Sequence, residues 1–132
     1  MSKTIHYPSF NRKNEVESYE NLIVWQKSMD LVILIYALTA DFPRDEIYGL
    51  ISQMRRAAMS ISSNIAERSR RSSKRDFRNF LINAYGSGAE LETQVKISKK
   101  LGFGDDKNYP KIESPLLEAV KMLNKLIANL QT

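Results

Sequence analysis

The feature that most constrains this chain of 132 residues is an apolar residue at every third or fourth position along four long segments. This spacing places the apolar side chains on one face of an α-helix. Short stretches containing Pro, Gly or Ser separate the four segments. Helices joined by short connections pack as antiparallel neighbours, so the sequence predicts an all-α, up-down antiparallel four-helix bundle. We expect residues 19–131 to form this single domain, preceded by a flexible N-terminal tail at residues 1–18.

The first predicted helix begins near residues 19–22 and ends before Phe42-Pro43, because the residue before a proline disfavours the α region. Its expected core stripe consists of Leu22, Trp25, Met29, Val32, Ile33, Tyr36 and Ala37. The second helix is expected to start near Asp45, or beyond Gly49, and to extend to the basic residues at 68–71. Its expected core stripe consists of Ile47, Leu50, Ile51, Met54, Ala58, Ile61 and Ile65.

The third predicted helix follows Ser73, which suits an N-cap position with Asp76 three residues later, and it ends near Gly102. Small residues at 84–89 indicate close approach to a neighbouring helix. Its expected core stripe consists of Phe77, Phe80, Leu81, Ala84, Gly88, Leu91, Val95 and Ser98.

The fourth helix begins either at Ser114-Pro115, as N-cap and first helical residue, or near Asp106 with a kink at Pro115. Its expected core stripe consists of Leu116, Val120, Leu123, Ile127 and Leu130.

The composition excludes several classes of function. There is no Cys and only one His, which excludes disulfides and thiolate metal sites and leaves one imidazole for catalysis. The sequence contains no nucleophile elbow, no Gly-rich phosphate loop and no Glu-x-x-His motif of di-iron bundles. We therefore expect a protein that is not an enzyme and that needs no cofactor or metal. The longest apolar stretch, Leu31–Leu38, is too short to span a bilayer, and no signal peptide is visible, so we expect a cytoplasmic protein without a membrane partner.

Positive charge is concentrated between the second and third predicted helices. Residues 55–78 contain eight Lys or Arg and two acids, a net charge of +6, whereas the whole chain carries +5. Such a local charge attracts polyanions, and arginine binds phosphate as a bidentate donor. We name the candidate nucleic-acid-binding set the basic junction: Arg68, Arg70, Arg71, Lys74, Arg75 and Arg78. The alternative is a solvated helix junction whose arginines form ion pairs with Glu67 and Asp76.

A polar stripe lies beside the apolar stripe of the second helix, at steps of three and four residues. In an antiparallel bundle it faces polar residues in the second half of the third helix. Glu90 and Glu92 diverge on a helix because they are two residues apart, so they do not form an acid-base pair. We interpret the whole set as a polar network that holds the helix register or a subunit contact: Gln53, Arg56, Ser60, Asn64, Glu67, Glu90 and Thr93.

Several short motifs together resemble a known family. In chain order they are Leu22-x-x-Trp25-Gln26-Lys27, Phe42-Pro43-x-x-Glu46-x-x-Gly49-Leu50, Gln53-x-Arg55-Arg56-Ala57, Ser60-Ile61, Asn64-Ile65-Ala66-Glu67, Phe80-Leu81, Ala84-x-Gly86-Ser87 and Glu90-Leu91-Glu92-Thr93-Gln94. Together they resemble the bacterial four-helix-bundle proteins encoded in intervening sequences of 23S rRNA genes, often labelled S-twenty-three ribosomal proteins. The resemblance extends from about Tyr19 to Leu130.

The resemblance implies a left-handed bundle, a homopentamer shaped as a short barrel, and no enzymatic activity. It also implies similarity to the accessory protein of diversity-generating retroelements, a basic pentamer that binds nucleic acid and a reverse transcriptase. Two positions depart from the family pattern. Arg68 stands where Gly is common, which extends the second helix or changes the turn, and Pro115 is unexpected if the last helix starts early. We therefore expect a homo-oligomer that binds RNA or DNA; the alternative is a protein-interaction scaffold without a direct nucleic-acid role.

Overall fold

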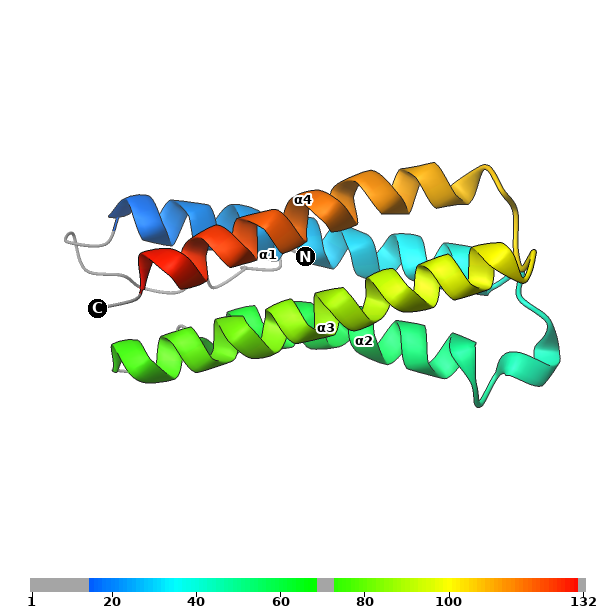
Figure 1. Cartoon of the computed structure of the whole chain (residues 1–132), viewed down its shortest axis with the longest axis horizontal. Coiled ribbons are helices and arrows are strands. Elements are labelled where there is room, and N and C mark those ends of the chain that lie inside the picture. Colours follow the sequence, from blue (N-terminus) through cyan, green and yellow to red (C-terminus); the bar gives the residue numbers. More distant parts are fainter. Residues whose placement is uncertain (1–14, 69–72, 131–132) are drawn as a thin grey trace, which may run out of the picture.

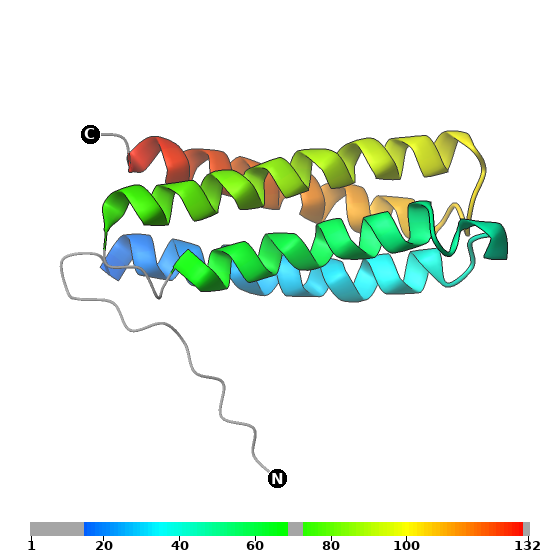
Figure 2. The ribbon, with the colours of Figure 1, turned by 90° about the horizontal axis from the view of Figure 1, so that it is seen from below.

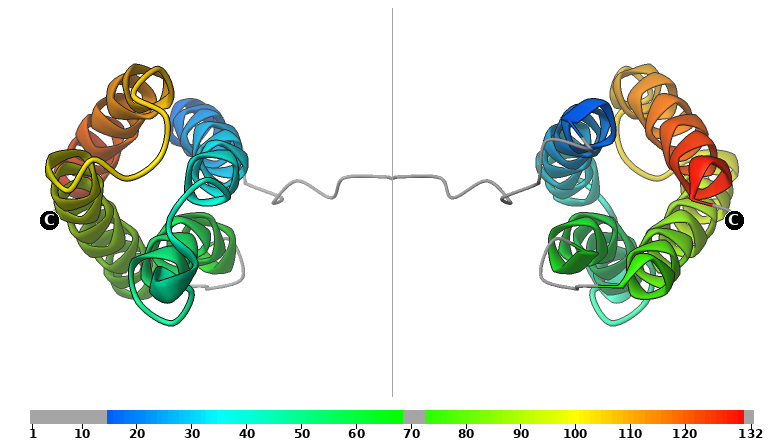
Figure 3. Two further views of the ribbon diagram at one scale, coloured as in Figure 1. Left: turned by 90° about the vertical axis from the view of Figure 1, so that its right-hand side faces the viewer. Right: turned by 90° about the vertical axis from the view of Figure 1, so that its left-hand side faces the viewer.

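Figure 1 shows the computed structural model of the chain, which describes residues 15–68 and 73–130. Its helices are α1 (Glu15–Thr39), a short 3-10 helix η2 (Arg44–Glu46), α2 (Leu50–Arg68), α3 (Lys74–Lys100) and α4 (Asn108–Asn129). Consecutive α-helices run in opposite directions (Figures 1 and 2), and the described part of the chain contains no strand. The end-on views in Figure 3 place α1 and α3 at diagonal corners of the bundle. The predicted all-α four-helix bundle is confirmed.

One stripe from each helix forms the core, and the predicted stripes of α3 and α4 are buried or half-buried as expected. In α2 the prediction holds from Leu50 to Ile65, but Ile47 precedes the helix and is exposed. The four helices each contribute fully buried apolar side chains, which include Leu31, Ile35, Met54, Ile61, Leu81, Leu91, Ile112 and Leu123.

The stripe predicted for α1 is wrong at four positions. Met29, Ile33, Tyr36 and Ala37 are exposed, and Ile33 is exposed by 71%. The α1 residues that enter the core are instead Val24, Ser28, Leu31, Ile35 and Leu38. Because α1 is apolar on nearly every side, the spacing of its apolar residues does not select one face.

The apolar length of α1 is also greater than the estimate from Leu31–Leu38. The window Leu22–Thr39 has a mean hydropathy of 1.5, so by length and composition alone this helix is apolar enough to cross a membrane. In the bundle α1 instead packs against α2 and α4 along its core stripe, and 33% of the window is buried.

Helix α2 starts at Leu50, beyond Gly49, which is the second of the two predicted starts. The Leu50 backbone N–H donates to Glu46 Oε2 at 3.2 Å, so the Glu46 carboxylate stabilises the positive end of the helix. A Cβ atom at Gly49 would lie 2.7 Å from the same oxygen. This cap therefore requires a residue without a side chain at position 49. At its other end α2 continues through Arg68, as expected if that residue extends the helix.

Helix α3 begins as predicted. The Ser73 hydroxyl oxygen accepts a hydrogen bond from the Asp76 backbone N–H at 3.1 Å, so Ser73 is the N-cap. At the C-terminal end, Gly102 has a φ of 74°, and the Phe103 N–H donates to the Ser98 carbonyl at 3.0 Å. This is the left-handed glycine termination that the sequence indicated.

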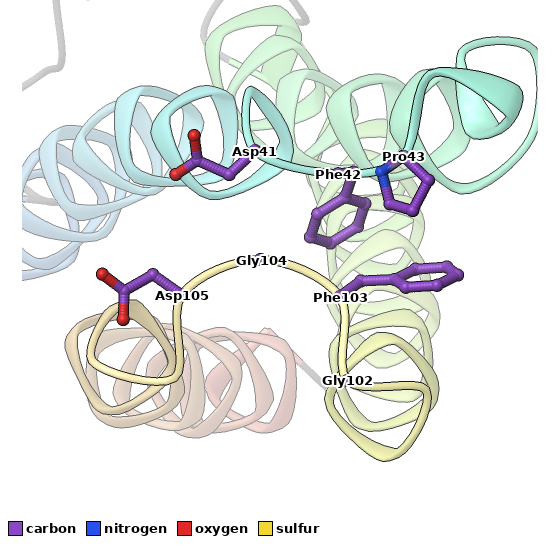
Figure 4. A pocket seen from close by; sticks show the side chains of 7 residues that line it. All are labelled: Asp41, Phe42, Pro43, Gly102, Phe103, Gly104 and Asp105. Carbon is purple, nitrogen blue, oxygen red and sulfur yellow. The ribbon is translucent and has the colours of Figure 1, made fainter.

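The two loops at the far end of the bundle meet at an aromatic pair (Figure 4). The rings of Phe42 and Phe103 lie 5.5 Å apart and tilted by 58°. A Cβ atom at Gly104 would lie 3.1 Å from the Phe42 ring, and the φ of Gly104 is 75°, so only glycine fits there. Asp41 and Asp105 lie on the rim of an open pocket of about 520 Å³ beside these rings. The aromatic pair closes this end of the core.

Helix α4 starts near Asp106 and not at Ser114-Pro115, so the first of the two predicted starts is wrong. Pro115 lies inside the helix. The residues before it explain the early start, because Tyr109 and Ile112 are fully buried. The Tyr109 hydroxyl also donates to the Phe103 carbonyl at 2.6 Å, which fixes the first turn of α4 to the preceding loop.

Candidate nucleic-acid interface and polar groove

The basic junction lies at the end of the bundle where α2 stops and α3 begins (Figure 2). Arg68 is the last residue of α2, and Arg70 and Arg71 fall outside the described residues. Lys74 and Arg75 are exposed in the first turn of α3. The fold therefore presents at least two of the six predicted residues to solvent at one end of the molecule.

The first turn of α3 is an unfavourable place for cations. A helix N-terminus carries partial positive charge and unpaired N–H groups, so Lys74 and Arg75 destabilise the helix slightly. The Ser73 cap and the Asp76 carboxylate offset part of this effect. Cationic side chains and backbone N–H groups at one helix end form a favourable environment for an anion such as phosphate.

Arg78 is half-buried one turn into α3. Its Nε atom is buried and has no hydrogen-bond acceptor among the described residues. A buried donor without an acceptor lowers folding stability by about 1–3 kcal/mol. Arg78 therefore stabilises the bundle less than an arginine whose Nε is hydrogen-bonded.

The opposite end of the bundle carries both signs of charge. Its exposed charged residues are Asp41, Arg44, Asp45, Lys99, Lys100, Asp105, Asp106 and Lys107. Lys99 is paired with Glu113 of α4 at 3.1 Å. Residues 67–78 contain six Lys or Arg and two acids, a net charge of +4 out of +5 for the whole chain, so the net positive charge is concentrated at the basic junction.

A shallow polar groove lies between α2 and α3. The hydroxyl oxygens of Ser60 and Ser87 are 2.8 Å apart, and the Asn64 amide donates to the Ser60 carbonyl at 2.8 Å and its hydroxyl at 3.1 Å. Gln53, Arg56, Ser60, Ser87 and Glu90 line a pocket of about 170 Å³ there with Ala57. The antiparallel packing thus brings the first half of the α2 polar stripe to Glu90, as predicted.

Two members of the predicted polar network lie differently. Thr93 is exposed and donates to the Ala89 carbonyl of its own helix at 3.2 Å, so it does not reach α2. Glu67 is half-buried near the end of α2, beyond the groove, and has an interaction of its own there. Ser87 was missed, although its place among the small residues at 84–89 marked it as a point of close helix approach.

The two charged side chains of the groove, Arg56 and Glu90, each form a hydrogen bond with a neutral side chain of their own helix. Arg56 donates to Ser52 Oγ at 3.3 Å, and Glu90 accepts from the Gln94 amide at 3.2 Å. Within residues 15–68 and 73–130, no three His, Asp or Glu side chains are grouped so that they could hold a metal ion. The groove is suited to holding the α2–α3 register through short hydrogen bonds.

The fold and this charge distribution define a class: a small antiparallel helical bundle with a basic end. Residues 20–125 match the family described as 23S rRNA-intervening sequence protein. The match covers most of the chain, and the chain belongs to this family. No curated protein matches the chain.

A solved structure shares the fold. It is the crystal structure of a protein of unknown function from the S23 ribosomal protein family of Bacteroides thetaiotaomicron. The two chains are 23% identical, superpose with a TM-score of 0.72, and align over 83% of this chain and 98% of the other.

Proposed function

We propose that this protein is a non-enzymatic homo-oligomer that binds the phosphate backbone of RNA or DNA through the basic junction. The observation that carries the proposal is the group of six Lys or Arg and two acids within residues 67–78, a net charge of +4, where α2 ends and α3 begins. Backbone phosphates are recognised by clustered cations without a unique geometry, so a short exposed cluster is sufficient for non-specific binding.

Two features of α3 support this assignment. Lys74 and Arg75 occupy the helix end at which cations are least favourable for folding, so folding stability does not account for their position. Arg78, one turn further along α3, is half-buried and adds a third cation beside them. A homo-oligomer would repeat this modest site several times, and avidity would then compensate for the weakness of each copy.

The test is a salt series of RNA and DNA binding with matched variants. The double variant Lys74→Ala/Arg75→Ala removes two cations at the junction, and Lys96→Ala/Lys100→Ala removes two exposed cations elsewhere on α3. We expect the first to reduce the slope of log affinity against log salt by roughly 1.4–1.8 and the second to leave it unchanged. A slope near zero for the wild-type protein, or equal effects of both variants, contradicts the proposal.

The second candidate function is a protein-interaction scaffold without a direct nucleic-acid role. The exposed apolar side chains of α1 favour it, because solvent alone gives them no stabilisation. Crosslinking and sequencing of nucleic acid recovered with the protein from its native cell separates the two functions. Enrichment of RNA or DNA that is lost in Arg70→Ala/Arg71→Ala/Arg75→Ala supports the first, and its absence supports the second.

A further inference from the structure

The pocket between α2 and α3 holds two opposite charges that are not paired with each other. Arg56 of α2 and Glu90 of α3 line this pocket of about 170 Å³, and both side chains are exposed. Within the described part of the chain they form no ion pair with each other. Arg56 Nη2 instead donates to Ser52 Oγ, and Glu90 Oε1 accepts from the Gln94 amide. The pocket therefore keeps a donor-only group and an acceptor-only group on facing walls.

The hydrogen bond between Ser60 and Ser87 shows why these two charges meet. Their hydroxyl oxygens are 2.8 Å apart, so the two residues are level along the bundle axis. Antiparallel helices rise equally per residue, so Arg56, four residues before Ser60, is level with Glu90 to within one residue. A ligand between the two helices can therefore contact the guanidinium and the carboxylate at the same time.

The size of the pocket limits what it can hold. Its volume of about 170 Å³ is the space of roughly six water molecules, at about 30 Å³ for each. This is room for one small planar molecule and too little for a peptide helix. The remaining polar groups of the lining, the Gln53 amide and the Ser60 and Ser87 hydroxyls, both donate and accept. The pocket thus suits a small polar molecule with donors on one edge and acceptors beside them.

The seam between α2 and α3 runs from this pocket to the basic junction. Figures 1 and 2 show the two helices side by side, joined at the end where the junction lies. Arg68 lies 12 residues after Arg56, or about 18 Å of helix, which is the length of about five stacked nucleotides. Residues 60–66 of α2 and 77–89 of α3 contain no acid. A strand whose phosphates contact the basic junction therefore meets no carboxylate along this seam before the pocket.

We propose that the pocket binds one unpaired guanine base of a single strand whose phosphates contact the basic junction. Guanine presents two adjacent donors, N1–H and the N2 amino group, and two acceptors, O6 and N7, beside them. The Glu90 carboxylate accepts from the two donors, and the Arg56 guanidinium donates to the two acceptors. The inference rests on the proposed function, and it names the form of nucleic acid and the base that the protein selects.

The other bases match this pair of side chains less well. Adenine and cytosine each present one amino donor beside a ring acceptor, and uracil presents one ring donor between two acceptors. Only guanine offers two donor atoms to one carboxylate. In a duplex the Watson–Crick edge of guanine is already paired, whereas proteins read this edge in unpaired bases. The pocket therefore predicts a preference for single strands and, within them, for guanine.

The test uses single-stranded RNA oligonucleotides of about ten nucleotides, a length within the usual range of single-strand sites. All positions are uracil except one central base, which is guanine, adenine, cytosine, uracil or hypoxanthine. Hypoxanthine has the ring system of guanine without the N2 amino group. Affinities are measured by fluorescence anisotropy across a salt series, and the guanine oligonucleotide is also measured as a duplex with its complementary strand.

The protein variants include a matched control. Glu90→Gln removes the carboxylate from the pocket, and Glu92→Gln makes the same change of charge two residues away, on a side of α3 that diverges from Glu90. Arg56→Lys keeps the positive charge but removes the planar, bidentate donor. Circular dichroism confirms that each variant is folded.

We expect the wild-type protein and Glu92→Gln to bind the guanine oligonucleotide about 5- to 100-fold more tightly than the adenine, cytosine and uracil ones. Hypoxanthine should lie between, because it keeps one of the two donors. Glu90→Gln and Arg56→Lys should lose the preference, and Arg56→Lys should keep the wild-type salt slope because its charge is unchanged. Duplex formation should also remove the preference for guanine.

Equal affinity of the wild type for all single strands, with a normal salt slope, refutes the guanine pocket and leaves the phosphate contact of the proposed function intact. A preference that survives in Glu90→Gln, that persists in the duplex, or that is lost equally in Glu92→Gln also refutes it. If guanosine monophosphate competes as strongly as the guanine oligonucleotide, the ligand is a free nucleotide and the inference is wrong. If no oligonucleotide binds, the proposed function fails and the inference fails with it.

Discussion

Two glycines two residues apart on α3 give opposite predictions for the same substitution. A Cβ atom at Gly88 would lie 2.9 Å from Val120 Cγ2 of α4 and 4.0 Å from Ile61 Cδ1 of α2. A Cβ atom at Gly86 would meet nothing within 4 Å. Gly88→Ala therefore tests whether α3 and α4 approach as closely as the structure shows, and Gly86→Ala is its matched control.

The magnitudes follow from two terms. Replacing Gly by Ala inside a helix stabilises it by about 1 kcal/mol, and both variants gain this amount. Gly88→Ala also overpacks the core, which costs about 1–3 kcal/mol. Val120 is β-branched and has one preferred rotamer in a helix, so its methyl group does not swing away. We expect Gly86→Ala to raise the free energy of unfolding by about 1 kcal/mol and Gly88→Ala to fall about 1–3 kcal/mol below it.

The assay is urea unfolding followed by circular dichroism, supported by thermal melts, where a domain of this size shifts by roughly 3–6 °C per kcal/mol. Both variants are compared at one protein concentration, because assembly adds stability that depends on concentration. Repeating the comparison at several protein concentrations separates that contribution from the effect of the substitution. If Gly88→Ala is as stable as Gly86→Ala, the helices are not in contact at this point and the reasoning is refuted.

Three further predictions concern single interactions. Ser73→Ala removes the N-cap of α3 and should lower stability by about 1 kcal/mol in the same urea assay, whereas Ser73→Asp should restore it. Thr39→Val removes the acceptor of Arg55 Nε and should cost about 1–3 kcal/mol, an effect that disappears when Arg55 is already Ala. Burial raises the pKa of the Tyr109 phenol above its usual value near 10, so stability should be constant below pH 10 and fall as the pH rises through the folded-state pKa. Tyr109→Phe should abolish that alkaline loss in pH-dependent unfolding, although it also removes the hydrogen bond to Phe103.

The parts of the fold that follow from local chemistry were predicted from the sequence. The core stripe of α3, the Ser73 cap and the glycine termination at Gly102 each depend on a few neighbouring residues, and each is found in the structure. The groove between α2 and α3 also followed from the polar stripe and the antiparallel packing. Its partner on α3, Ser87, was missed because the sequence does not show which of several small residues faces α2.

The start of α4 depended on a balance that only the packed structure decides. Pro115 inside the helix costs about 3 kcal/mol, which favours a start at Ser114. Full burial of Tyr109 and Ile112 stabilises the early start by about 1.5–3 kcal/mol for each side chain. The hydrogen bond from the Tyr109 hydroxyl to the Phe103 carbonyl stabilises it further. The helix therefore begins early and includes the proline. The cost of a proline inside the helix can be estimated from the sequence, but the burial that outweighs it is known only from the folded structure.

The misassigned face of α1 has a different cause. Spacing at three and four residues identified two stripes on this helix, and the prediction combined residues from both. Val24, Leu31, Ile35 and Leu38 face the core, whereas Met29, Ile33 and Tyr36 face solvent in the single chain. A helix that packs only against the core of its own bundle needs one apolar stripe. Ile33, in the middle of α1, is exposed by 71% and so adds nothing to the stability of the single chain. The prediction failed on α1 because Met29, Ile33 and Tyr36 form a second apolar face at the same helical spacing as the core residues, so spacing alone cannot show which of the two faces enters the core.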